Sequence, residues 1–109
     1  MLIVGERRLE TTDSGFLVDT DAWDEGVAEV LAAGAGIELS EAHWEIIRFI
    51  RAYYLEFRHL PNNRMFVKVV QKEFGPEKSN SRYLHRLFPG SAVKYACLIA
   101  GLPKPPGCI

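Results

Sequence analysis

The stretch Ser40-Glu-Ala-His-Trp-Glu-Ile-Ile-Arg-Phe-Ile-Arg-Ala-Tyr-Tyr-Leu-Glu-Phe57 is the longest segment of this chain with a helical pattern. Its apolar residues recur at spacings of three and four and form one broad stripe: Trp44, Ile46, Ile47, Phe49, Ile50, Tyr53, Tyr54 and Phe57. So wide a stripe predicts a core helix that contacts several neighbours at once. Ser40 is the expected N-cap. We expect the helix to end at His59-Leu-Pro61, because the residue before a proline avoids helical geometry.

On the amino-terminal side of this helix, the pattern predicts short strands and then a first helix. Leu2–Val4 and Arg7–Glu10 flank a turn that contains a glycine, which is typical of a β-hairpin. Phe16–Val18 is a candidate third strand. Asp21 is the expected N-cap of a helix that includes Trp23 and that a Gly-Ala-Gly sequence ends.

On the carboxy-terminal side, three more helices are expected. The first covers about Asn62–Phe74, the second is short and is capped by Asn80 or Ser81, and the third covers Ala92–Ala100. The predicted fold class is therefore α+β, mostly α, with an amino-terminal β-hairpin followed by about five helices. One domain spans residues 1–109: a hairpin region (1–18), a helical bundle (21–101) and a flexible carboxy-terminal arm (102–109).

The composition is that of a soluble globular domain, because 48% of the residues are hydrophobic and 25% are charged. No apolar run approaches the roughly 20 residues that cross a bilayer, and the apolar stretch at the amino terminus is too short for a signal peptide. We therefore expect a cytoplasmic protein with no membrane partner. Thiols stay reduced in that compartment.

The net charge of −1 conceals an asymmetry along the chain. Residues 1–44 hold two arginines against ten acidic residues, a balance of −8, whereas residues 45–109 hold eleven cations against four acids, a balance of +7. Two interpretations fit this pattern. Either the second half forms a basic face for a negatively charged partner, or the two halves neutralise each other in the fold.

The two short helices that flank Gly75-Pro76-Glu77-Lys78 resemble a helix-turn-helix element. Six cations on or near them are candidates for phosphate contacts: Arg64, Lys68, Lys72, Lys78, Arg82 and Arg86. The alternative is a solvated basic face on a helical bundle. Because dedicated DNA-binding domains are usually strongly basic, transient contact with RNA or with an acidic protein fits this chain better.

Conventional catalytic or metal-binding patterns are absent from the sequence. His43, His59 and His85 are scattered and do not have the spacing of a zinc site. There is no Ser-His-Asp order, phosphate-binding glycine loop or EF-hand pattern, so no metal and no cofactor are expected. We interpret His43 and His85 as residues of the surface or of the edge of the core.

The segment Cys97-Leu-Ile-Ala-Gly-Leu-Pro-Lys-Pro-Pro-Gly-Cys108 holds both cysteines of the chain. Its three prolines favour an extended path of roughly 25 Å from residue 102 onward, which places Cys108 near the tip of an arm. Thiol reactivity depends on the thiolate fraction, which Lys94 and Lys104 are expected to raise and the terminal carboxylate to oppose. Cys97 is either a buried packing thiol or, if the arm folds back, a second redox thiol.

The stretch Glu77-Lys-Ser-Asn-Ser-Arg-Tyr-Leu-His-Arg-Leu-Phe-Pro89, then Lys94, Ile99-Ala-Gly-Leu-Pro-Lys-Pro105 and Cys108, closely resembles the DsrC/TusE family of sulfur-relay proteins. The likeness extends to Ala42-His-Trp44 and to Trp23 and covers nearly the whole chain. It implies a mostly helical fold with an amino-terminal hairpin, a helix-turn-helix-like element and a mobile arm. It also implies that Cys108 carries a persulfide, so the protein is a sulfurtransferase that acts as a co-substrate.

The family resemblance implies two branches with different partners. In the tRNA-thiolating branch, an upstream heterohexameric relay complex supplies sulfur, which passes to the thiouridylase bound to tRNA for 2-thiouridine formation at the wobble position. In the dissimilatory branch, siroheme sulfite reductase is the partner, and a trisulfide or disulfide forms between Cys97 and Cys108. Cys97 matches the dissimilatory type, whereas Met1-Leu-Ile and Tyr54-Leu-Glu-Phe57 look closer to the tRNA-thiolating type. Segment 88–95 departs from both around Lys94, and we favour the tRNA relay.

Overall fold

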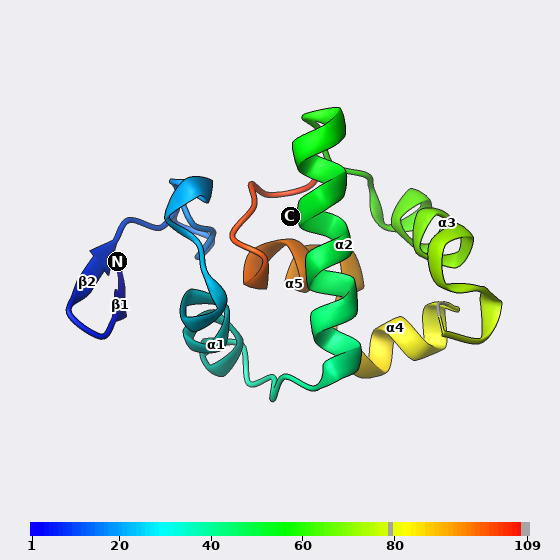
Figure 1. Cartoon of the computed structure of the whole chain (residues 1–109), viewed down its shortest axis with the longest axis horizontal. Coiled ribbons are helices and arrows are strands. Elements are labelled where there is room, and N and C mark those ends of the chain that lie inside the picture. The colour runs from blue at the N-terminus through cyan, green and yellow to red at the C-terminus, as the bar shows by residue number, and fades with distance from the viewer. Residues whose placement is uncertain (79, 108–109) are drawn as a thin grey trace.

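The computed structural model in Figure 1 describes residues 1–78 and 80–107. Helix α2 (Glu41–Phe57) runs across the front of the molecule. Its N-cap is Ser40, as predicted, and it ends just ahead of the predicted stop, at Arg58, which has a left-handed φ of 59°. Ile46, Ile47 and Ile50 of its apolar stripe are buried. The expected core helix is confirmed.

Helix α5 (Ala92–Ile99) is the most enclosed element of the fold. Six of its eight residues are buried, and it contacts α1 (Glu25–Gly34), α2, α3 (Asn63–Phe74) and α4 (Ser81–Leu87). Figure 1 shows α5 behind α2, with α1 on one side and α3 and α4 on the other. A helix that is apolar on most of its surface, as α5 is apart from Lys94, is expected in such a buried position. The root of the carboxy-terminal arm therefore lies at the centre of the molecule.

The amino-terminal hairpin is present as predicted. Strands β1 (Leu2–Val4) and β2 (Arg7–Leu9) pair antiparallel, and the two-residue loop between them has Gly5 at a φ of 61°. The candidate strand at 16–18 is wrong. Its backbone makes one isolated bridge, Thr11 to Leu17, because a tight turn at residues 12–16 takes up the neighbouring hydrogen bonds.

The first helix begins later than the sequence pattern indicated. Asp21 lies in a separate 3₁₀ turn, η1 (Thr20–Ala22), and Asp24 is the N-cap of α1, where its Oδ1 accepts from the backbone N–H of Val27 at 2.9 Å. Trp23 therefore precedes the helix. The physical reason is a long-range contact, because the Trp23 indole is held by the far end of α5.

Helices α3 and α4, joined by the 3₁₀ turn η2 (Pro76–Lys78), form the helix-turn-helix-like element. Their N-caps are Asn62 and Asn80, whose side chains accept from the N–H groups of Met65 and Tyr83. The short helix is thus capped by Asn80 rather than by Ser81. No helix among the described residues is long and apolar enough to cross a membrane.

Candidate functional site: the carboxy-terminal arm and its anchor

The arm leaves α5 at a sharply defined turn. Gly101 has a φ of 70°, and the Nε1–H group of Trp23 donates to the carbonyl oxygen of Ile99 at 2.8 Å. The guanidinium of Arg51 donates to the next carbonyl, that of Ala100, at 2.8 Å. Two of the carbonyls that the end of a helix leaves without a partner are therefore satisfied by side chains from other elements.

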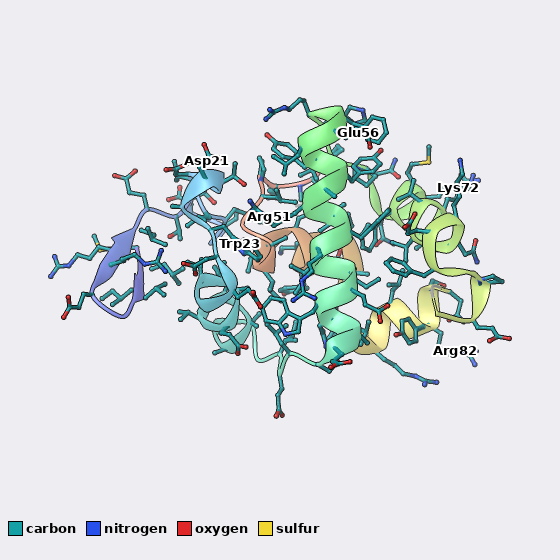
Figure 2. The ribbon with its side chains drawn as sticks, viewed as in Figure 1. Asp21, Trp23, Arg51, Glu56, Lys72 and Arg82 are labelled. Atoms are coloured by element: carbon teal, nitrogen blue, oxygen red, sulfur yellow. The ribbon has the colours of Figure 1, made fainter. Side chains whose placement is uncertain are left out.

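Arg51 also covers the indole ring of Trp23. Its guanidinium carbon lies 4.2 Å from the ring centroid, which is a cation–π contact, and Figure 2 shows the two side chains together between η1 and α2. Burial lowers the pKa of Arg51 from its usual value, and the charge of Asp21 opposes that shift. We name Trp23, Arg51 and Gly101 the arm anchor.

The described part of the arm packs against the body. Leu102 is buried and its N–H donates to the carbonyl oxygen of Cys97 at 3.0 Å, and Pro105 is buried as well. Figure 1 shows the arm turning back from the end of α5 toward the carboxy-terminal part of α2. The prediction of an extended arm in water from residue 102 onward is therefore wrong for these residues. Apolar contact with the bundle outweighs the preference of proline for a solvated, extended path.

The last described residue of the arm, Gly107, lines a cavity of about 490 Å³. The cavity lies between the amino-terminal ends of α3 and α5, and its polar walls include Asn62, Ser91 and Lys94. Lys94 also lies 5.6 Å from the ring centroid of Tyr95. A cation thus lines the same cavity as the last described residue of the arm. Lys104 is exposed on the arm itself.

The two cysteines are in different situations. Cys97 is completely buried in α5, in agreement with the interpretation as a packing thiol. Cys108 lies outside the described residues, so the structure gives no distance between the two sulfur atoms. Its link to the structure is the peptide bond to Gly107 at the edge of the cavity.

The structure places five of the six cations that were predicted to form a basic face. A cation of the second half that lies elsewhere, Arg48, does pair with an acid of the first half, Glu25. Figure 2 shows Lys72 and Arg82 at one end of the molecule and Asp21 toward the other. The ion pairs found among the described side chains are Arg7–Asp24 and Arg48–Glu25, so the five described cations of that face are outside them: Arg64, Lys68, Lys72, Arg82 and Arg86. All five are exposed. The side chain of Lys78 lies outside the described part of the chain.

His43 has a structural position, whereas His59 and His85 are exposed. His43 is buried, and its Nδ1 accepts from the N–H of Ser40 at 3.1 Å while its Nε2 lies 2.7 Å from the carbonyl oxygen of Leu87. A ring nitrogen that faces a carbonyl carries the hydrogen, so His43 ties the start of α2 to the end of α4. Within residues 1–78 and 80–107, no group of three His, Cys, Asp or Glu side chains is placed to hold a metal ion.

Comparison with known proteins gives one consistent result. The family model described as "DsrC like protein" matches residues 3–109. This chain belongs to the DsrC-like family. Among curated proteins, it is 52% identical to the sulfurtransferase TusE of Salmonella choleraesuis and 50% identical to that of Escherichia coli K12, in both cases over the full length of both chains.

Solved structures of DsrC proteins share the fold of this DsrC-like chain. The NMR structure of Allochromatium vinosum DsrC has a TM-score of 0.89 at 44% identity and covers 99% of this chain and 97% of its own. The oxidized gamma-subunit of the dissimilatory sulfite reductase (DsrC) from Archaeoglobus fulgidus has a TM-score of 0.85 at 45% identity and covers 99% of this chain and 98% of its own.

The sequence pattern does not predict one part of the arm anchor of this DsrC-like protein, Arg51. Arg51 stands inside the apolar stripe of α2, four residues after Ile47 and three before Tyr54. A single cation within an otherwise apolar face indicates a buried partner for its charge, since charged side chains are seldom buried without one.

Proposed function

We propose that this DsrC-like protein is a sulfurtransferase that carries sulfane sulfur as a persulfide on Cys108. The observation that carries the proposal is the complete burial of Cys97, one of only two cysteines in the chain. A thiol without exposed surface does not reach the sulfur of another protein. The full-length identity to sulfurtransferases named TusE supports the same role.

The chemistry is thiol–persulfide exchange and is balanced without a cofactor. The Cys108 thiolate attacks the terminal sulfur of the donor persulfide, the donor S–S bond breaks, and a new S–S bond forms on Cys108. The donor thiolate leaves with the electron pair and takes up the proton that Cys108 lost. Lys94 and Lys104 favour the thiolate and persulfide anions by their charge. The same exchange in the opposite sense delivers the sulfur to an acceptor thiol.

The partners that we propose are those of the tRNA-thiolating branch. Sulfur arrives from a heterohexameric relay complex in the cytoplasm and is passed to the thiouridylase bound to tRNA, for 2-thiouridine formation at the wobble position. The identity to TusE proteins, 50–52%, exceeds the 44–45% to the solved DsrC proteins, which favours this branch.

The experiment that tests the carrier role is mass spectrometry of the intact protein after incubation with inorganic polysulfide. We expect a gain of one sulfur atom that dithiothreitol removes. Cys108→Ser should abolish the gain, whereas the matched variant Cys97→Ser should retain it. A Cys108→Ser protein that still relays sulfur to an acceptor would overturn the proposal.

The second candidate is a DsrC-type partner of siroheme sulfite reductase, and the presence of Cys97 favours it. In this alternative, Cys97 and Cys108 form a disulfide or trisulfide. Because Cys97 is buried in the core, the arm or α5 must move before the two sulfur atoms can bond. Copurification with a sulfite reductase, together with loss of function in Cys97→Ala, would establish this branch. A pure tRNA carrier tolerates that substitution.

A third candidate is a nucleic-acid-binding regulator that uses the helix-turn-helix-like element. The exposed cations of α3 and α4 are the observation in its favour. Such a protein would bind DNA in a salt-dependent manner after removal of residues 102–109.

A further inference from the structure

Two cavities meet beside the end of the described arm. The one that Gly107 lines shares Asn63, Gly90 and Ser91 with a second cavity of about 560 Å³. The second cavity continues between α3 and α4 and reaches Arg82, His85 and Arg86. The two adjoining cavities, here named together the Ser91 groove, extend from the residue before Cys108 to a cationic end on α4.

The Ser91 groove has apolar as well as polar lining. Val67 and Tyr95 are half-buried and Pro106 is exposed, above the buried residues Leu84, Ala92 and Val93. The side-chain Oδ1 of Asn63 accepts from the N–H of Val93 at 3.3 Å, which ties α3 to α5 along the groove. The groove is thus lined by elements that are joined to each other within the bundle.

The walls of the Ser91 groove favour negative charge. Lys94 stands at the arm end, and Arg82 and Arg86 stand at the far end, outside the ion pairs found among the described side chains. The groove also crosses the amino-terminal end of α5, where the helix dipole is positive and where the N-cap Ser91 makes no capping hydrogen bond with its side chain. An occupant with acidic groups and some apolar surface complements both the cationic and the apolar lining.

We propose that the Ser91 groove receives an acidic, extended peptide segment of the protein that exchanges sulfur with Cys108. This inference rests on the proposed carrier function. A groove whose accessible lining includes Val67, Tyr95 and Pro106 fits the side chains of a polypeptide. RNA phosphates are better matched by the exposed row of Arg64, Lys68 and Lys72 on α3. A segment seated in the groove would direct the partner's cysteine toward the arm end.

The test compares transfer from a protein donor with loading from a small molecule. The variant R82E/R86E reverses two charges of the groove, and R64E/K68E makes the same change in charge on α3 outside the groove. Sulfur transfer is measured from the purified, persulfidated heterohexameric relay complex and, separately, from inorganic polysulfide. We expect R82E/R86E to slow transfer from the complex by about tenfold or more and to remove most of its salt dependence. R64E/K68E should stay within about twofold of the wild type, and loading from polysulfide should not change in either variant.

A steric variant tests the groove independently of charge. Ser91→Phe places a large side chain where the two cavities meet, and because the Ser91 side chain makes no capping hydrogen bond, the substitution removes no cap. Slower transfer from the complex with unchanged polysulfide loading would support the proposal. Equal effects of R82E/R86E and R64E/K68E, or no effect of R82E/R86E, would overturn it. Loss of tRNA binding in R82E/R86E with normal transfer from the complex would also overturn it, in favour of an RNA surface. Failure of the wild type to load from polysulfide would instead contradict the carrier function itself.

Discussion

Trp23 and Gly101 lie in such close contact that a Cβ atom at residue 101 would overlap three atoms of the Trp23 side chain. The two residues are 78 positions apart in the sequence, and the contact fixes the point where the arm leaves the bundle. The indole N–H of Trp23 donates a hydrogen bond to the carbonyl oxygen of Ile99, and the guanidinium of Arg51 donates one to that of Ala100. The direction of the arm is therefore set by the body of the protein rather than by the prolines of the arm alone.

Gly101→Ala tests this contact, with Gly36→Ala as its control. Both glycines have a left-handed φ, 70° and 74°, but no heavy atom lies within 4 Å of a Cβ at Gly36. Each substitution introduces backbone strain of about 1–2 kcal/mol. We expect Gly101→Ala to lower the free energy of unfolding by at least about 1 kcal/mol more than Gly36→Ala, measured by urea denaturation, because Trp23 must also move. Equal losses in the two variants would show that the Trp23 contact is unimportant.

Arg51→Met removes the cation of the arm anchor, and Arg48→Met is the matched change on the same helix. Arg51 is partly buried and donates to the carbonyl of Ala100, whereas Arg48 is exposed and pairs with Glu25 at 3.5 Å. We expect Arg51→Met to lower the free energy of unfolding by about 1–3 kcal/mol and Arg48→Met by at most about 0.5 kcal/mol. Limited proteolysis should also cleave the arm sooner in Arg51→Met. An arm equally resistant in both variants would contradict the anchor.

Much of the fold follows from local rules that the sequence displays. Ser40 is an N-cap as predicted, and the helix expected from about Asn62 begins directly after that residue. A polar side chain just before an apolar helical pattern satisfies the first N–H groups. The N-cap of the first helix lies three residues after the predicted one, because Asp19, Asp21 and Asp24 are all residues that can cap a helix. A contact with α5, far along the chain, decides which of them begins α1.

The candidate site was only partly predictable for the same reason. The cation Lys94 near the arm end could be anticipated from its place before the proline segment. The folded path of the arm could not, because the burial of Leu102 and Pro105 depends on surfaces that exist only after the helices have packed. The Ser91 groove likewise combines residues from α3, α4, α5 and the arm.

Stability in acid should depend on Asp24. The pKa of its carboxyl is lowered, first by the hydrogen bond from the N–H of Val27 and further by the charge of Arg7, whose Nη2 lies 2.9 Å from Oδ2. A depressed pKa in the folded state means that the stabilisation is complete above the ordinary value of 3.8 and is lost as the pH falls through the lowered value. Asp24→Asn should therefore destabilise the protein at pH 7 and have a progressively smaller effect below pH 3.8, as followed by urea denaturation across pH. The loop variant Asp13→Asn is the control, and an Asp24→Asn effect independent of pH would contradict the assignment.

Cys97 should be inert in the folded protein. Its side chain is completely buried in α5, and a thiol reacts only where a reagent reaches its thiolate. In the Cys108→Ser variant, which leaves Cys97 as the single cysteine, we expect only slow reaction with a thiol-specific reagent under native conditions and rapid, full reaction in guanidinium. The rate under native conditions should be that of opening of the structure, and Gly101→Ala should raise it by releasing the root of the arm. Rapid labelling of the native Cys108→Ser protein would show that Cys97 is accessible and would favour the two-thiol mechanism over the single carrier.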